Sequence, residues 1–131
     1  MTDPAIDARL REALGAASSS DRLKAALDAG TYPNPGFVPA LIEQCAIEPD
    51  FPVREMLTWA LLRHPADLTV PLLVDETRNG GAQARGQALH TLSKIGDPRG
   101  WEAITRALLV HDDDTIARTA WRAAAILAPQ D

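Results

Sequence analysis

A unit of about 31 residues recurs three times along this chain. A fixed period of this size is typical of repeat proteins, in which pairs of helices stack and each pair contacts mainly its neighbours. The repeat therefore predicts an all-α fold more strongly than any other feature of the sequence. The landmarks that recur are Val38, Val70 and Trp101; Leu41, Leu73 and Ile104; and Arg54, Arg85 and Arg118.

Apolar spacing and turn residues place the individual helices. We expect the six helices of the repeats at about 36–47, 52–64, 68–79, 83–95, 99–110 and 115–128. Before them, Asp3 should cap a first helix beginning at Pro4, and a second helix at 21–29 should be capped by a serine and end at Gly30. No stretch alternates apolar and polar residues with period two, so the sequence predicts no strand.

The clearest copy also points to a family. Residues 84–99 read Ala-Arg-x-x-Ala-Leu-x-x-Leu-x-x-Ile-Gly-Asp-Pro-Arg, followed at 101–108 by Trp-Glu-Ala-Ile-x-x-Ala-Leu. This pattern resembles the HEAT-like repeats of the phycobilin-lyase type. The resemblance spans about residues 36–131 and implies an α-solenoid, a right-handed superhelix in which the second helix of each pair lines a concave side.

The resemblance also predicts how the chain is divided. Three HEAT-like helix pairs would occupy about 36–66, 67–97 and 98–131, and residues 1–35 would form an N-terminal helical cap of the same single domain. Most proteins of this kind are scaffolds or adaptors. Some bind a chromophore as lyases or chaperones, and some distant relatives are DNA glycosylases, so these two activities remain the alternatives to a binding role.

Composition narrows the environment and the partners. The net charge of −5 disfavours a nucleic-acid backbone as the main partner. The lone Cys45 excludes an internal disulfide and suits a reducing cytosol, and arginine outnumbers lysine as in GC-rich, bacterial genomes. No apolar run approaches the roughly 20 residues that span a bilayer, and the first ten residues lack the apolar stretch of a secretion signal. A cytoplasmic location without membrane contact is the prediction.

Residues that could carry chemistry have simpler structural explanations. His64, His90 and His111 lie in different repeats without the spacing of metal ligands. One residue of the run Asp112–Asp114 should cap the last helix rather than bind calcium, and Cys45 should pack on an apolar face. We therefore expect no metal, no cofactor and no enzymatic activity.

The resemblance implies a role for the repeated arginines. Repeats of this family often carry an Asp four residues before an Arg at the head of the second helix. Asp50 and Arg54, and Asp114 and Arg118, have this spacing, whereas the middle repeat has Gly81 before Arg85. We expect these five residues, Asp50, Arg54, Arg85, Asp114 and Arg118, to form a structural ladder of ion pairs between neighbouring repeats.

A helical projection of the three second helices predicts a ridge that could bind a protein or peptide. Trp59 on this ridge has two interpretations: it either contacts a partner or packs against a neighbouring repeat or the N-terminal cap. Trp121, in the apolar last helix, should fill the end of the core, and the alternative is that this helix docks onto another copy, as a homodimer, or onto a partner. The ridge residues are Glu55, Thr58, Trp59, Leu62, Leu89, His90, Arg122 and Ile126.

Overall fold

The computed structural model describes residues 4–130, and these residues contain helices and no strand, which confirms the all-α class. Asp3, the expected cap of the first helix, lies outside the described residues. The α-helices are α1 (Pro4–Leu14), α2 (Ser19–Thr31), α3 (Val38–Ile47), α4 (Phe51–Leu62), α5 (Ala66–Asn79), α6 (Ala82–Ile95), α7 (Arg106–Leu109) and α8 (Asp114–Leu127), and the 3-10 helices are η1 (Pro35–Phe37) and η2 (Pro98–Ala103).

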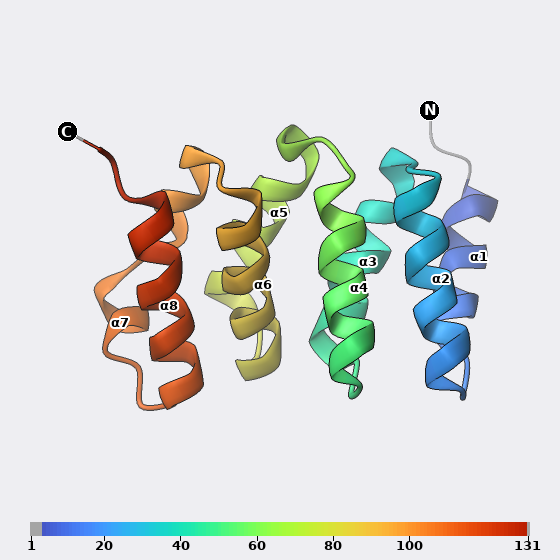
Figure 1. The fold of residues 1–131 in the computed structure, drawn as a ribbon, viewed down its shortest axis with the longest axis horizontal. Helices are drawn as coiled ribbons and strands as arrows, with labels where there is room; N and C mark the ends of the chain where they lie inside the picture. The colour runs from blue at the N-terminus through green and yellow to red at the C-terminus, as the bar shows by residue number, and fades with distance from the viewer. Residues whose placement is uncertain (1–3, 131) are drawn as a thin grey trace.

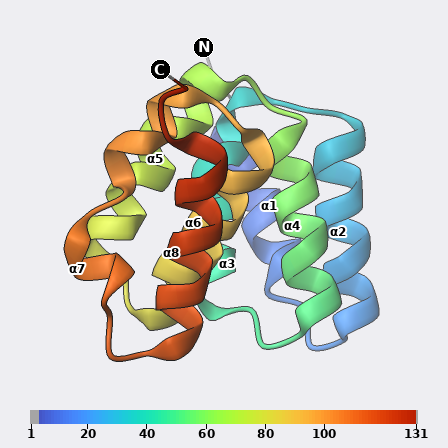
Figure 2. The same cartoon turned by 60° about the vertical axis from the view of Figure 1, so that its left-hand side comes forward.

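The helices lie in two rows along the long axis of the molecule. Figure 1 shows α2, α4, α6 and α8 side by side in chain order, with α1, α3, α5 and α7 behind them. Figure 2 shows the α8 end of the front row coming forward. Within the front row α2 packs on α4, α4 on α6 and α6 on α8, while α3 packs on both α4 and α6 and α5 packs on α6. The middle helices are therefore covered from behind and on both flanks.

Local signals account for most of the helix ends. The Ser18 hydroxyl accepts a hydrogen bond from the amide of Asp21 and caps α2, as expected for a serine. Gly96 adopts a left-handed conformation (φ 71°) and ends α6, after which the Asp97 carboxylate caps η2. The predicted helices at 36–47, 52–64, 68–79, 83–95 and 115–128 are confirmed, with small shifts of their ends.

Two of the predicted helix boundaries are wrong. Gly30 does not end α2, which continues to Thr31; it lies buried beneath the Trp59 ring, where a Cβ atom would come within 2.4 Å of Trp59 Cζ3. The expected helix at 99–110 is instead η2 followed by α7. The backbone is extended at Thr105, whose hydroxyl caps a new helix by accepting a hydrogen bond from the amide of Leu108.

The buried positions of the second helices repeat in a definite register. Val53, Ala84 and Ile116 are buried at equivalent positions, 31 and 32 residues apart. The next turn continues the series with Leu57, Ala88 and Ala120. Arg54 and Arg85 therefore correspond to Ala117, so the prediction that Arg118 is their equivalent is wrong by one residue. Asp112 and Asp113 precede α8, and Asp114, the third aspartate of the run, is its first residue.

A buried ion pair joins α2 to the end of α3. The Glu48 side chain is fully buried, and its carboxylate accepts two hydrogen bonds from the Arg22 guanidinium, at 2.9 and 3.0 Å. Gln44 and the amide of Asp50 donate to the same carboxylate, each at 3.0 Å. Every strong acceptor site of this buried charge is thus occupied, as a charge removed from water requires.

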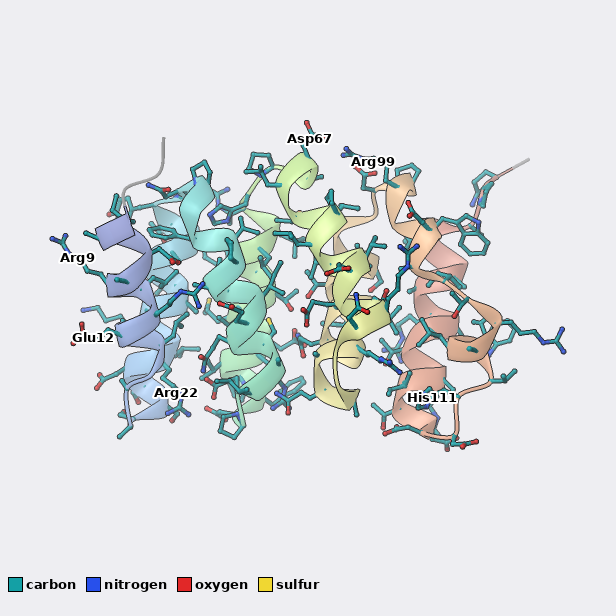
Figure 3. The ribbon with its side chains drawn as sticks, turned by 180° about the vertical axis from the view of Figure 1, so that it is seen from behind. Arg9, Glu12, Arg22, Asp67, Arg99 and His111 are labelled. Atoms are coloured by element: carbon teal, nitrogen blue, oxygen red, sulfur yellow. The ribbon has the colours of Figure 1, made fainter. Side chains whose placement is uncertain are left out.

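A second, exposed ionic contact lies at the opposite end of the helices. The Arg99 guanidinium reaches the carboxylates of Asp67 at 2.6 Å and Asp97 at 2.7 Å. Figure 3 shows Asp67 and Arg99 together at the end of the molecule opposite Arg22. This contact joins the start of α5 to η2, and its exposure to solvent limits what it contributes to stability.

These carboxylates predict how stability depends on pH. Burial alone would raise the pKa of Glu48, but the hydrogen bonds from Arg22, Gln44 and Asp50 outweigh it and hold the pKa below its ordinary 4.5. The Arg99 side chain and amide lower the pKa of Asp97 from 3.8 to about 2. Groups with lowered pKa stabilise the fold fully above their unfolded pKa and lose that contribution as pH falls through the folded value.

We therefore expect the free energy of unfolding to stay level between about pH 7 and 5 and to fall steeply below about pH 4.5. Urea unfolding followed by circular dichroism at a series of pH values measures this directly. A Glu48→Gln variant should show a shallower acid dependence than the wild type. An acid limb of equal steepness in both proteins would contradict the role given to Glu48.

Candidate functional site

A groove crosses the first halves of three helices in the front row. It has a volume of about 600 Å³, and α4, α6 and α8 all contribute to its walls. Each of these helices begins at the same end of the molecule, so the repeat itself brings their first turns together (Figure 1). The lining residues are Phe51, Arg54, Glu55, Ala82, Gln83, Gly86, Gln87, His90, Asp113, Thr115, Ile116, Thr119 and Arg122.

The acidic side chains of the groove are already engaged. The Glu55 carboxylate lies 3.0 Å from His90 Nε2, which joins α4 to α6 across the groove. Asp113 caps α8, because its carboxylate accepts hydrogen bonds from the amides of Thr115 and Ile116, at 2.9 and 3.3 Å. This confirms that one aspartate of the run 112–114 serves as a helix cap.

Gly86 lies in the wall of the groove, in the interior of α6. A Cβ atom added there would meet no atom within 4 Å, so packing does not require a glycine at this position. Glycine inside a helix costs about 1 kcal/mol relative to alanine. A residue that destabilises its helix and leaves the groove open fits a surface approached closely by another molecule.

Trp59 borders a second, smaller hollow and packs onto α2. The hollow has a volume of about 350 Å³, with Leu27, Met56 and Trp59 among its walls. The Trp59 ring covers Gly30 and remains 39% exposed. Arg63 contacts both Trp59 and Gly30. Its guanidinium lies 5.9 Å from the Trp59 ring centroid, and its Nε donates to the Gly30 carbonyl at 3.1 Å. Of the two interpretations, the structure supports packing against the first 35 residues.

The exposed residues of the predicted ridge do not form one continuous surface in the structure. Glu55, His90 and Arg122 line the groove together. Leu62 and Ile126 are exposed but lie outside the lining of that groove. Trp59 borders the smaller hollow beside it.

Two members of the ridge are buried, and the prediction of their exposure is wrong. Thr58 is 3% exposed, and its hydroxyl bonds that of Thr91 at 2.8 Å between α4 and α6. Leu89 is fully buried in a cluster with Leu108, Ile116 and Ala120. The projection assumed a helix that is covered from one side, whereas α4 and α6 are covered on three.

The expected ladder of ion pairs does not form. Arg54 donates from Nη1 to the Glu48 carbonyl at 2.9 Å and is not paired with Asp50. Arg85 donates to the Arg78 carbonyl at 3.2 Å, so both arginines satisfy carbonyls at the ends of the helices that precede theirs. Among residues 4–130, Arg118 pairs only with Asp114, at 3.5 Å within one exposed turn. Arg54 and Arg85 thus connect their helices to the ends of the preceding ones, and Arg118 connects no two helices.

Trp121 does not fill the core, as we expected from the sequence. It is 60% exposed, and Ala120 takes the buried position equivalent to Leu57 and Ala88. The Trp121 indole nitrogen donates to the Leu109 carbonyl at 3.0 Å, which holds the ring against α7. In this register Trp121 corresponds to Thr58 and Leu89, the residues that face the next helix of the row.

The other candidate residues have structural roles. Buried His64 bonds the Ala60 carbonyl through Nδ1 at 2.7 Å and accepts from the amide of Asn34 through Nε2 at 3.3 Å. Burial raises the pKa of the Cys45 thiol to about 12, so it remains protonated at neutral pH. Within residues 4–130, no three His, Cys, Asp or Glu side chains are grouped closely enough to hold a metal ion.

Sequence reasoning missed several residues of the groove. Gln83 and Gln87 lie one turn apart on α6. Gln83 donates to the carbonyls of Cys45 and Glu48, each at 2.9 Å. Phe51 is 60% exposed at the start of α4. The small residues Ala82 and Gly86, one turn apart, were the available signal, because small side chains on one helix face leave room for another chain.

Comparison with known proteins does not assign the chain to a family. No protein-family model matches the chain, and no curated protein matches it significantly. Across the described part of the chain, none of the helices combines the length and apolar character needed to span a membrane.

Proposed function

We propose that the protein is a short α-solenoid of HEAT-like helix pairs that acts as a non-enzymatic scaffold or adaptor and binds a protein or peptide. The division into a cap at 1–35 and pairs at 36–66, 67–97 and 98–131 belongs to this proposal, as do the right-handed superhelix and the cytoplasmic location. The row α2, α4, α6 and α8, backed by the other helices, supports it.

The observation that carries the proposal is the groove itself. Three consecutive second helices contribute side chains to one open surface, and the Gly86 position leaves space that a Cβ atom would enter freely. Because the walls are built on helices that pack against one another, a ligand would bind without ordering much of the protein, which favours affinity.

The alternative activities are less well supported. A DNA glycosylase would need a basic groove with an available carboxylate. The fully buried Glu48 is bound by Arg22 and is absent from the groove lining, where Glu55 and Asp113 offset Arg54 and Arg122. For a chromophore lyase, the buried Cys45 thiol is protonated and packed in the core. Self-association through α8 stays a prediction, and sedimentation of the wild type and a Trp121→Ala variant would test it.

Selection from a random peptide library tests the proposed function. We expect the wild type to enrich peptides that a Gly86→Phe variant binds at least about tenfold more weakly, a loss of about 1.4 kcal/mol, because the new ring occupies the groove. Ala125→Phe, which adds the same ring on an exposed face of α8, is the matched control and should bind normally. Circular dichroism establishes that both variants fold. Equal binding by wild type and Gly86→Phe would overturn the proposal, as would failure of the wild type to enrich any peptide.

A further inference from the structure

We infer that the groove between α4, α6 and α8 selects an acidic peptide segment, an inference that rests on the proposed binding function and names the chemistry of the partner. It depends on which polar groups of the groove are already satisfied within the protein and which remain free for a ligand. Figure 1 shows the three helices that carry these groups.

The two arginines of the groove form no ion pair with any group in the described part of the chain. The Arg122 guanidinium has no hydrogen bond or ion pair with any group in the described part of the chain. Arg54 directs Nη1 to the Glu48 carbonyl and forms no ion pair there. The two acids of the lining keep their negative charges, but both are hydrogen-bonded within the protein, Glu55 to His90 and Asp113 to the first amides of α8. A ligand with carboxylates between α4 and α8 would therefore meet two guanidinium groups that can still form ion pairs.

The neutral groups of the groove favour a polypeptide. The side-chain nitrogen atoms of Gln83 and Gln87 donate within the protein. Gln83 donates to the carbonyls of Cys45 and Glu48, each at 2.9 Å, and Gln87 donates to the Thr58 hydroxyl at 2.8 Å and to the Arg54 carbonyl at 3.5 Å. These carbonyls can only accept, so each glutamine presents its amide oxygen as a free acceptor. A peptide backbone supplies N–H donors for two such acceptors one turn apart, whereas a phosphodiester backbone supplies none.

The two observations together define the ligand. Free acceptors along α6 suit a peptide main chain, and free arginines on α4 and α8 suit acidic side chains on that chain. Gly86, between the two glutamines, would let the main chain approach closely. The overall charge of −5 lies elsewhere on the molecule and would discourage acidic chains from binding outside the groove.

Fluorescence anisotropy with three matched peptides tests this inference. The peptides share one sequence except at four positions, which carry Glu, Gln or Lys. We expect the Glu peptide to bind most tightly, and Arg122→Gln to weaken its binding about tenfold at low salt, because the variant removes a charge-assisted contact. Arg106→Gln, the same charge change on exposed Arg106 of α7, is the control and should have little effect. Raising the salt concentration should reduce the preference for Glu.

The outcomes separate this inference from the proposed function. Equal or tighter binding of the Gln or Lys peptide, lost in Gly86→Phe, would overturn the acidic selectivity and leave the binding groove intact. No binding of the Glu peptide, while library peptides of other composition bind the groove, would also overturn it. If neither these peptides nor any library peptide bind, both proposals fail. A single-stranded oligonucleotide that binds the groove more tightly than the Glu peptide would contradict the argument from the glutamine acceptors.

Discussion

Glu48→Gln should lower the free energy of unfolding by about 3–5 kcal/mol, the largest effect we expect from any single substitution in this protein. The carboxylate that it removes is fully buried and accepts both hydrogen bonds from Arg22, whose side chain is only 13% exposed. Without that carboxylate, a mostly buried guanidinium loses its counter-ion while the rest of its surroundings stay unchanged. Removing one partner of a buried ion pair destabilises a protein far more than replacing both partners by apolar residues.

A matched control is available on the neighbouring helix turn. Glu43 pairs with Arg11 between α3 and α1, but both side chains are exposed, at 61% and 42%. Glu43→Gln should therefore cost less than about 1 kcal/mol. Urea unfolding of both variants at pH 7 measures the two losses. Losses of equal size would show that Glu48 contributes no more than a surface residue and would contradict the structure at this point.

The double variant Arg22→Met/Glu48→Met tests the origin of the effect. If the loss of stability in Glu48→Gln comes from an unpaired buried charge, the double variant should lose less stability than the sum of the losses in Arg22→Met and Glu48→Met. Additive losses would instead assign the effect to packing around α2 and α3.

Gly30→Ala should destabilise the protein by about 2 kcal/mol, although alanine is the better helix former. The new methyl group would meet the Trp59 ring at 2.4 and 2.7 Å and the Ala60 Cα at 3.0 Å, which requires the ring or the backbone of α4 to move. Gly86→Ala is the control, because its methyl group would meet no atom within 4 Å. That variant should instead gain about 0.5–1 kcal/mol.

The Trp59→Ala background should reduce the loss of stability caused by Gly30→Ala. With the ring removed, only the Ala60 Cα at 3.0 Å still crowds the new methyl group, and the helix propensity of alanine partly offsets that contact, so the loss should fall below about 1 kcal/mol. Trp59→Ala alone should cost about 2 kcal/mol, less than a fully buried tryptophan because the ring is 39% exposed. Thermal and urea unfolding of the four proteins completes the cycle. Equal effects of Gly30→Ala in both backgrounds would show that the ring does not pack there.

The sequence predicted the elements whose causes are local. The Gly96–Asp97–Pro98 turn places a left-handed glycine, a cap and a proline where the backbone needs them, and α6 ends there as predicted. Ser18 and Asp113 cap their helices for the same reason. The prediction that Gly30 ends α2 was wrong because this glycine leaves room for the Trp59 ring of α4. That is a long-range contact, which no local pattern reveals.

The errors at the site come from packing and register. Thr58 and Leu89 lie on the flanks of their helices, and only the presence of neighbours on both sides explains why they are buried. The one-residue slip before α8 moved Arg118 and Trp121 out of the positions that the repeat assigned to them. Glu48 is a charged residue next to a turn, and its burial depends on Arg22 from an earlier helix.

The groove was only partly visible in the sequence. The projection found Glu55, His90 and Arg122, because each points away from the core stripe of its own helix. Gln83 and Gln87 were missed because their side chains look like ordinary polar surface until the carbonyls that hold their nitrogen atoms are known. Hydrogen-bond commitments across helices are a tertiary property, and they decide which groups remain for a ligand.

The most direct test of the binding groove is to observe the glycine amides by NMR while a library-selected peptide is titrated. The chain has eight glycines, and protein labelled only at glycine gives a simple spectrum. Gly86 lines the groove, whereas Gly15 follows α1 and Gly100 is buried beside Leu127. The account predicts a saturable shift of the Gly86 resonance with Gly15 and Gly100 unchanged. A bound peptide that leaves Gly86 unmoved while either of the others shifts would contradict it.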